Sequence, residues 1–224
     1  MNDLKKSFND ISKKYDSQRR KLIPCFDDFY GTVVNFAEIT GDHPKILDIG
    51  AGTGLLTEFL LPKFPEAEFE LMDISEEMLE VAKKRFAGNG NVKVALADYS
   101  KKNFSLNYDL IVSSLSIHHL EDEEKRKLMQ KIYDSLNPGG IFINADQFVA
   151  ESENVEKKYR AIWYQKIEET DLKKTEKDAA YERMKLDRLA NLSSYLIWLK
   201  ETGFSDIEVL YKYLIFAVVY CKKS

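Results

Sequence analysis

Cysteine is nearly absent from this chain, and long apolar runs are missing altogether. The two cysteines among 224 residues, Cys25 and Cys221, are far apart and lack metal-ligand spacing, which excludes a disulfide framework or a cysteine-based zinc site and favours a reducing compartment. No apolar run approaches the length of a membrane span, and the start of the sequence lacks the apolar core of a signal peptide. We therefore expect a cytoplasmic protein with no membrane contact.

The chain also lacks an excess of positive over negative charge. Lys and Arg number 33 against 37 Asp and Glu, which gives a formal net charge of -4 and no global attraction to nucleic acid. The short basic clusters are interleaved with acids and are typical of solvated faces. Nucleic acid is therefore not an expected partner, and the sequence leaves open whether the protein is a monomer or a homodimer.

What the sequence does contain is a regular alternation of apolar strands and amphipathic helices. Apolar runs at 46–49, 69–73, 92–96, 109–114 and 141–143 are separated by segments with helical spacing. This alternation predicts an α/β fold, a Rossmann-like doubly wound parallel sheet with helices on both faces. A turn is expected at 137–140, just before the fifth strand.

Helical segments are expected before and after this alternation. Residues 1–43 are expected to form a helical lid. One amphipathic helix is predicted near 3–16 and is interrupted at 19–21, and a second helix begins at Pro24. Residues 150–189 predict a charged helical addition, followed by a last crossover helix that Gly203 closes. Two closing strands, 207–210 and 214–219, form a hairpin. The whole of 1–224 is expected to be a single domain.

The first strand ends in a glycine-rich loop that points to a ligand. Asp48 is followed by glycines at alternate positions, Gly50, Gly52 and Gly54, and then by an apolar helix. Glycines let the backbone turn sharply and approach a ligand, and the helix N-terminus offers free N–H groups. A dinucleotide fingerprint would need its third glycine at Leu55. The spacing therefore disfavours a nucleotide-dependent dehydrogenase.

A second landmark stands at the end of the second strand. Asp73 is a carboxylate at this place, where it can accept hydrogen bonds from both ribose hydroxyls of an adenosine. Ser75 is the expected N-cap of the next helix. The alternative interpretation is that Asp73 serves only as a capping partner for that helix.

Taken in order, these landmarks resemble the class I S-adenosylmethionine (SAM)-dependent methyltransferases over roughly residues 40–221. The matching segments are 47–54, 72–75, 97–98, 113–120 and 136–140. The resemblance implies a seven-stranded, mostly parallel sheet whose last strand is antiparallel. It also implies SAM as cofactor, S-adenosylhomocysteine (SAH) as product, methyl transfer to a small-molecule acceptor, and an N-terminal helix that closes over the cofactor.

The same resemblance assigns cofactor-binding positions. Asp48 is expected to face the amino group of SAM, Asp73 its ribose hydroxyls and Asp98 its adenine amino group. The full set of expected cofactor-binding residues is Tyr15, Asp48, Gly50, Ala51, Gly52, Gly54, Asp73, Ile74, Met78, Asp98, Tyr99 and Ser114. For Tyr15 and Met78 the alternative is simple packing of their helices.

Catalytic and acceptor-binding residues are less well defined. A base is needed only if the acceptor loses a proton, and the catalytic candidates are His119 and His118, just past the fourth strand; shaping the pocket or capping the next helix is the alternative. Asp146 is a further candidate, and no metal site is expected. Four residues of the helical addition could reach an acceptor or else only pack or face solvent: Trp163, Tyr164, Arg183 and Arg188.

Two alternatives to a methyltransferase stay open. Residues 128–140 and the helical addition are also similar to carboxy-SAM synthases, which modify the cofactor itself and need an arginine to hold a carboxylate near the sulfonium. Arg183 is the candidate for that role. The second alternative is a non-catalytic SAM-binding module whose helical addition is an interaction surface.

Overall fold

The computed structural model describes residues 15–105 and 107–224, so most of the helix expected near 3–16 lies outside the described residues. The strands are β1 (Lys45–Ile49), β2 (Glu68–Asp73), β3 (Val92–Leu96), β4 (Tyr108–Ser114), β5 (Leu136–Gln147), β6 (Phe204–Tyr213) and β7 (Phe216–Lys223). The helices are α2 (Tyr15–Leu22), α3 (Phe26–Phe36), α4 (Leu55–Leu60), α5 (Glu76–Arg85), α6 (Asp122–Ser135), α7 (Glu153–Glu168), α8 (Lys174–Met184) and α9 (Leu192–Thr202), with a 3-10 turn η2 (Ile117–His119).

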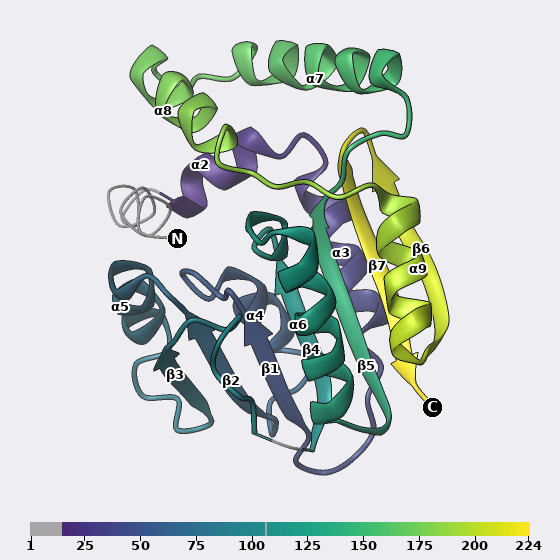
Figure 1. The fold of residues 1–224 in the computed structure, drawn as a ribbon. Helices are drawn as coiled ribbons and strands as arrows, with labels where there is room; N and C mark the ends of the chain where they lie inside the picture. The colour runs from purple at the N-terminus through teal and green to yellow at the C-terminus, as the bar shows by residue number, and fades with distance from the viewer. Residues whose placement is uncertain (1–14, 106) are drawn as a thin grey trace.

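The strands form one seven-stranded sheet of order β3-β2-β1-β4-β5-β7-β6 (Figure 1). Strands β1 to β5 are parallel, and β7 runs antiparallel between β5 and β6. This confirms the predicted Rossmann-like doubly wound sheet and its closing hairpin. The strand order reverses direction at β1 and β4, and in such sheets a ligand crevice opens there at the carboxyl ends of the strands.

Helices cover both faces of the sheet, as the alternation predicts. Helices α3, α4 and α5 lie on one face, and α6 and α9 lie on the other (Figure 1). The central strand β4 shows why both faces need cover. Its residues Leu110 and Val112 belong to the core beneath α3 and α4, whereas Ile111 belongs to the core beneath α6 and α9. Alternate side chains of a strand point to opposite faces of the sheet. A strand that is apolar on both faces is therefore buried on both sides.

Two sequence expectations about these elements are wrong. The run Arg19-Arg20-Lys21 does not interrupt a helix but forms the last turn of α2, where cations favour the negative end of the helix dipole. The turn expected at 137–140 is instead part of β5. Tyr108 pairs with Leu136 and Leu110 with Ile141, so the Asn-Pro-Gly-Gly segment forms an irregularity within the ladder, and Gly139 supplies the positive φ of 77° that it needs.

Helices α7 and α8 form a separate layer above the carboxyl ends of the strands, with α2 directly beneath α8 (Figure 1). The indole of Trp163 donates to the carbonyl of Leu22 at 2.8 Å, and the amide of Gln18 donates to Glu176 at 3.2 Å. The expected helical addition is therefore fastened to the N-terminal helix. None of the helices in the described part of the chain combines the length and apolar character that a membrane span requires.

Candidate functional site

The glycine loop after β1 is fixed by bonds to the end of β2. The backbone N–H groups of Gly50 and Ala51 donate to the carbonyl of Met72 at 2.8 and 3.1 Å. The N–H of Gly52 donates to Asp73 Oδ2 at 2.9 Å. Strand β2 thus shapes the loop through both its backbone and its terminal carboxylate.

The three loop glycines all have positive φ, but they meet different surroundings. A Cβ on Gly52 would meet no atom within 4 Å, so this position faces open space. A Cβ on Gly54 would lie 2.5 Å from the Phe86 ring, and one on Gly50 would overlap Ser116. Gly52 is therefore the position where a ligand has room, while Gly54 is required for packing.

A cavity lies above this loop, at the crevice expected from the strand order. Its lining residues are Tyr15, Gly50, Gly52, Asp73, Ile74, Met78, Tyr99, Leu115, Ser116 and His119. We call it the cofactor cavity. Most of the residues expected to bind SAM therefore meet in one place, and Leu115 and Ser116 join them, although the sequence analysis did not single out either residue.

Asp73 lines this cavity and is held by backbone N–H groups. Its Oδ1 accepts from the N–H of Ser75 at 2.8 Å, while Ser75 itself caps α5 by accepting from Met78 N at 3.2 Å. Burial raises the pKa of Asp73, and the backbone N–H bonds oppose that rise. The carboxylate therefore accepts backbone bonds from Gly52, Ser75 and Ile74.

Five expected cofactor-binding residues lie outside the lining of this cavity: Asp48, Ala51, Gly54, Asp98 and Ser114. Asp48 is buried beneath the loop, where its Oδ2 accepts from Thr57 at 2.7 Å and its Oδ1 has no hydrogen-bond partner. Burial raises the pKa of Asp48 to about 7, against the opposing bond from Thr57. Such an orphaned acceptor suits a cationic ligand group.

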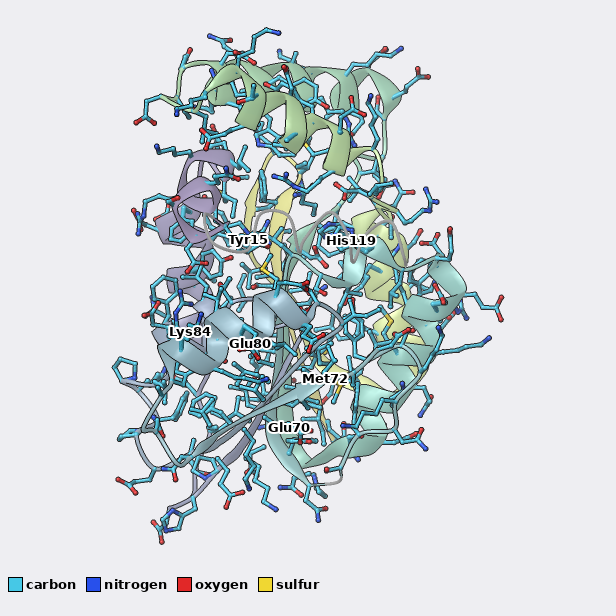
Figure 2. All side chains as sticks on the ribbon, turned by 90° about the vertical axis from the view of Figure 1, so that its left-hand side faces the viewer. Tyr15, Glu70, Met72, Glu80, Lys84 and His119 are labelled. Carbon is cyan, nitrogen blue, oxygen red and sulfur yellow. The ribbon has the colours of Figure 1, made fainter. Side chains whose placement is uncertain are left out.

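Helix α2 closes the cofactor cavity from above. Tyr15 lines the cavity. Asp16 accepts a hydrogen bond from Thr53 Oγ1 at 2.6 Å and forms an ion pair with Arg85. Arg19 stacks over the Tyr15 ring at 4.5 Å from its centroid. Figure 2 shows Tyr15 and His119 at the same level, between the sheet and the upper helical layer.

A second cavity adjoins the first beneath α7 and α8, and we call it the acceptor cavity. Its lining residues are Tyr15, Gln18, Arg19, Leu22, Ile23, Leu115, His118, His119, Gln147, Trp163, Ala180, Arg183, Met184, Asp187 and Phe216. Trp163 and Arg183, two of the four candidates from the helical addition, are thus placed at this cavity. The other two are not: Tyr164 stacks on Trp163, and Arg188 pairs with Glu121 on the surface.

His118 is held between two carboxylates at the edge of the acceptor cavity. Its Nδ1 contacts Asp146, and its Nε2 lies 3.4 Å from Asp187. Burial alone would lower its pKa, but the charges of Asp146 and Asp187 outweigh burial and raise the pKa of His118 to about 9. His118 is therefore a cation at neutral pH and cannot accept a proton there.

His119 has the opposite character, although it is the next residue. Burial and the neighbouring charge of His118 lower its pKa to about 4, so its imidazole is neutral at pH 7. The two rings lie 4.0 Å apart, centroid to centroid. His119 lines both cavities, which places a neutral proton acceptor at their shared wall.

His118, His119 and Asp187 are also the group in the described residues with the spacing of a metal site, since one ligand atom from each lies within 4.8 Å of the others. Hydrogen bonding accounts for the same arrangement. The positive charge of His118 between Asp146 and Asp187 balances the carboxylates, and the segment that carries Asp187 is fixed where Arg188 N donates to His118 O at 2.8 Å.

Several acceptor-cavity residues escaped the sequence analysis: Gln18, Arg19, Gln147 and Asp187. Arg19 stands one helical turn after Tyr15, so helical spacing from a suspected lid residue could have found it. Asp187 lies after α8 in an irregular segment, and no local pattern marks it. Its position follows only from the packing of this segment over η2.

The residues present fit SAM. The cavity offers the Asp73 carboxylate and open space at Gly52, and the carboxylate of Asp48 is buried directly beneath the loop, outside the cavity lining. A sheet of this order, with these groups at the ends of β1 and β2, is the architecture of the class I SAM-dependent methyltransferases.

Comparisons with known proteins agree with this class. Residues 46–140 match the family model of the methyltransferase domain. A carboxy-SAM synthase of Helicobacter hepaticus is 26% identical over 99% of this chain and 97% of its own length. A malonyl-acyl-carrier-protein O-methyltransferase of Neorickettsia risticii is 49% identical over 33% of this chain and 28% of its own length.

Among solved structures, phosphoethanolamine N-methyltransferase 2 of Haemonchus contortus in complex with SAM has a TM-score of 0.61 and 26% identity, covering 82% of this chain and 38% of that one. The present chain therefore spans well under half the length of that relative. By sequence and by fold, the present chain is therefore similar to the class I SAM-dependent methyltransferases, proteins that use SAM as their cofactor.

Proposed function

We propose that the protein transfers the methyl group of SAM to a small molecule bound in the acceptor cavity. The observation that carries this proposal is that the cofactor and acceptor cavities share a wall, formed by Tyr15, Leu115 and His119. A transferase needs its two ligands in contact and shielded from water. Helices α2, α7 and α8 supply that shield.

Cofactor binding in this proposal is divided among acidic side chains and the glycine loop. Asp73 accepts from the ribose hydroxyls, the orphaned Oδ1 of Asp48 accepts from the amino group, and Asp98 accepts from the adenine amino group. The loop residues Gly50, Ala51 and Gly52 hold the amino-acid part, with Ile74, Met78 and Tyr99 around the rest. Gly54 and Ser114 support the loop and the end of β4 from outside the cavity lining.

SAM, when bound, supplies a methyl group already activated by its positively charged sulfur. The chain's own residues then orient the acceptor and manage its proton. A nucleophile that gains positive charge during methylation makes its proton acidic, so a base of low pKa suffices. His119 is neutral and stands at the shared wall, so it takes that proton. His118 is a positioning residue, held by Asp146 and Asp187.

Incubation of metabolite extracts with isotopically labelled SAM, followed by mass spectrometry, tests this function. We expect label in a small molecule. For an acceptor that loses a proton, His119→Gln should lower kcat by about 10²–10⁴-fold, with a much smaller change in SAH affinity. Absence of label from every small molecule in broad extracts, with SAM bound normally, would favour the non-catalytic module.

A second candidate function is supported by one observation of its own. The carboxy-SAM synthases of Helicobacter hepaticus and of Nautilia profundicola align with nearly the whole chain, over 99% and 93% of it, and Arg183 lines the acceptor cavity. Mass spectrometry of the cofactor retained by the purified protein separates the two functions. A SAM heavier by one carboxyl group supports the synthase, and unmodified SAM or SAH supports the methyltransferase.

A further inference from the structure

Two arginines of the acceptor cavity have no carboxylate within ion-pair distance in residues 15–105 and 107–224. The chain has seven arginines, and those on the surface or beside α5 pair with carboxylates: Arg20, Arg85, Arg126, Arg160 and Arg188. Arg19 and Arg183 lack such a pair within 4.0 Å among the described residues. Both line the acceptor cavity.

Arg19 is the more enclosed of the two. Its guanidinium stacks on Tyr15 and interacts with the Tyr30 hydroxyl, and its Nε is buried with no hydrogen-bond partner. A buried donor without a partner costs about 1–3 kcal/mol, and more for a charged group. A protein that retains such a group gains if a ligand supplies the missing acceptor.

Arg183 lines the same cavity as Arg19. It comes from α8, whereas Arg19 comes from α2, and the two lie near enough for the charge of one to act on the other. Two like charges held together in a partly buried place repel each other unless an anion lies between them. Asp146 acts on the charge of Arg19 and Asp187 on that of Arg183, but among the described residues neither carboxylate forms an ion pair with its arginine. His118 lies between these two carboxylates and contacts both.

Another part of the cavity wall is apolar. Leu22, Ile23 and Met184 line it, together with Trp163 and Phe216, whose rings meet edge to face at 5.4 Å between centroids. A ligand that fills this cavity therefore meets two cations at one side and aromatic or aliphatic surface at another.

We propose that Arg19 and Arg183 form an anion subsite, so that the methyl acceptor is a small molecule with an apolar body and a carboxylate or phosphate group. Guanidinium groups bind these planar or tetrahedral anions through paired N–H bonds. The inference rests on the proposed function. The anion contacts the two arginines, and the apolar body extends toward the wall shared with the cofactor cavity at Leu115 and His119.

Calorimetric titration of three simple probes into SAH-saturated protein tests this subsite. The probes are phenylacetate, phenylphosphonate and the neutral phenylacetamide. We expect at least one acid to bind at least tenfold more tightly than the amide, and the tighter acid identifies the anion as carboxylate or phosphate.

Variants of the two arginines show where that preference arises. Arg19→Gln and Arg183→Gln should each weaken the preferred acid at least tenfold and leave the amide unchanged, and Arg183→Lys should recover part of the loss. Arg188→Gln is the matched control, because this nearby arginine pairs with Glu121 on the surface, and it should bind like the parent. Unchanged SAH affinity and melting temperature confirm that each variant is folded.

Three results with the simple probes would overturn the subsite. These are equal binding of acid and amide, no binding of either acid at millimolar concentration, and acid binding that survives both glutamine variants. Tighter binding of carboxy-SAM than of SAM, without any binding of phenylacetate, would also overturn it and move the anion onto the cofactor. Failure of the parent to bind SAH is a different outcome, because it contradicts the proposed function and not the subsite alone.

Discussion

The cofactor cavity and the acceptor cavity are built from different kinds of chain segment. The cofactor cavity takes nearly all its lining from residues that follow β1, β2, β3 and β4 directly, within a few positions of each strand end. The acceptor cavity draws on α2, α7, α8 and β7, segments held together by contacts such as Gln18 to Glu176, 158 residues apart. Changes in the segments above the sheet can therefore alter which acceptor binds, while the cofactor site at the strand ends stays the same.

Gly52→Val breaks the cofactor side of this comparison most severely. The position has a φ of 56° and open space around a Cβ, so a branched side chain would strain the backbone and occupy the ligand's place. We expect SAH affinity to fall by about a hundredfold or more, equivalent to roughly 2.7 kcal/mol, in calorimetry. Gly54→Ala is the contrast, because its Cβ would meet the Phe86 ring at 2.5 Å. This variant should lower the melting temperature more than it lowers SAH affinity. Normal SAH binding by Gly52→Val would show that the loop is structural.

Asp73→Ala sharpens the comparison within the cofactor cavity. Two charge-assisted bonds to ribose, at about 1.5–3 kcal/mol each and not additive, predict a loss of roughly tenfold to a few hundredfold in SAM affinity. Ser75→Ala is the control, since Ser75 is the cap of α5, and it should cost about 1 kcal/mol of stability with unchanged affinity. The deoxyribose analogues of SAM should bind the parent poorly and Asp73→Ala with little further loss. Equal SAM affinity in the parent and Asp73→Ala would reduce Asp73 to a support for the loop.

The acceptor side predicts a smaller effect, a dependence of stability on pH set by the two histidines. The folded pKa of His118 is about 9 against 6.5 for the free side chain, so its stabilisation is complete below pH 6.5 and is lost as the pH rises toward 9. The folded pKa of His119 is about 4, so its contribution is present above pH 6.5 and is lost as the pH falls toward 4. Each histidine contributes a slope of about 1 kcal/mol per pH unit to its limb, and the raised pKa of Asp48, about 7, contributes a slope of opposite sign on the acidic side.

Denaturant titrations from pH 4 to pH 9 measure both limbs. His118→Gln should flatten the alkaline limb relative to the parent, and His119→Gln should flatten the acidic limb. Parallel curves for the parent and both variants would contradict the assignment of a cationic His118 beside a neutral His119.

The sequence allowed the cofactor side to be predicted because its signals are local. The spacing of Gly50, Gly52 and Gly54 and the acid at Asp73 each follow a strand directly, and the strand pattern fixes which edge they share. The acceptor side has no such signal. Arg19 stood in a run of charge that suggested a helix break, yet its guanidinium is enclosed against Tyr15, and only the position of α7 and α8 above α2 makes that burial visible.

The opposite characters of His118 and His119 were beyond sequence reasoning for a related reason. Both are histidines after the same strand, and no feature of the neighbouring sequence distinguishes one from the other. Asp146 and Asp187 decide between them, because both carboxylates contact His118 and only the latter reaches His119. One of these acids arrives from an irregular segment nearly seventy residues later (187 − 118), which no periodicity announces.

Helix α2 has a consequence for the timing of turnover. It is fastened to the cofactor side through Asp16, which holds Thr53 and Arg85, and to the acceptor side through the bond from Trp163 to Leu22. One element therefore borders both cavities. We predict that a single opening of α2 releases both products, because lid motions of this kind commonly set kcat. The release rates of SAH and of methylated product should be equal in stopped-flow measurements, and weakening either fastening should raise both together.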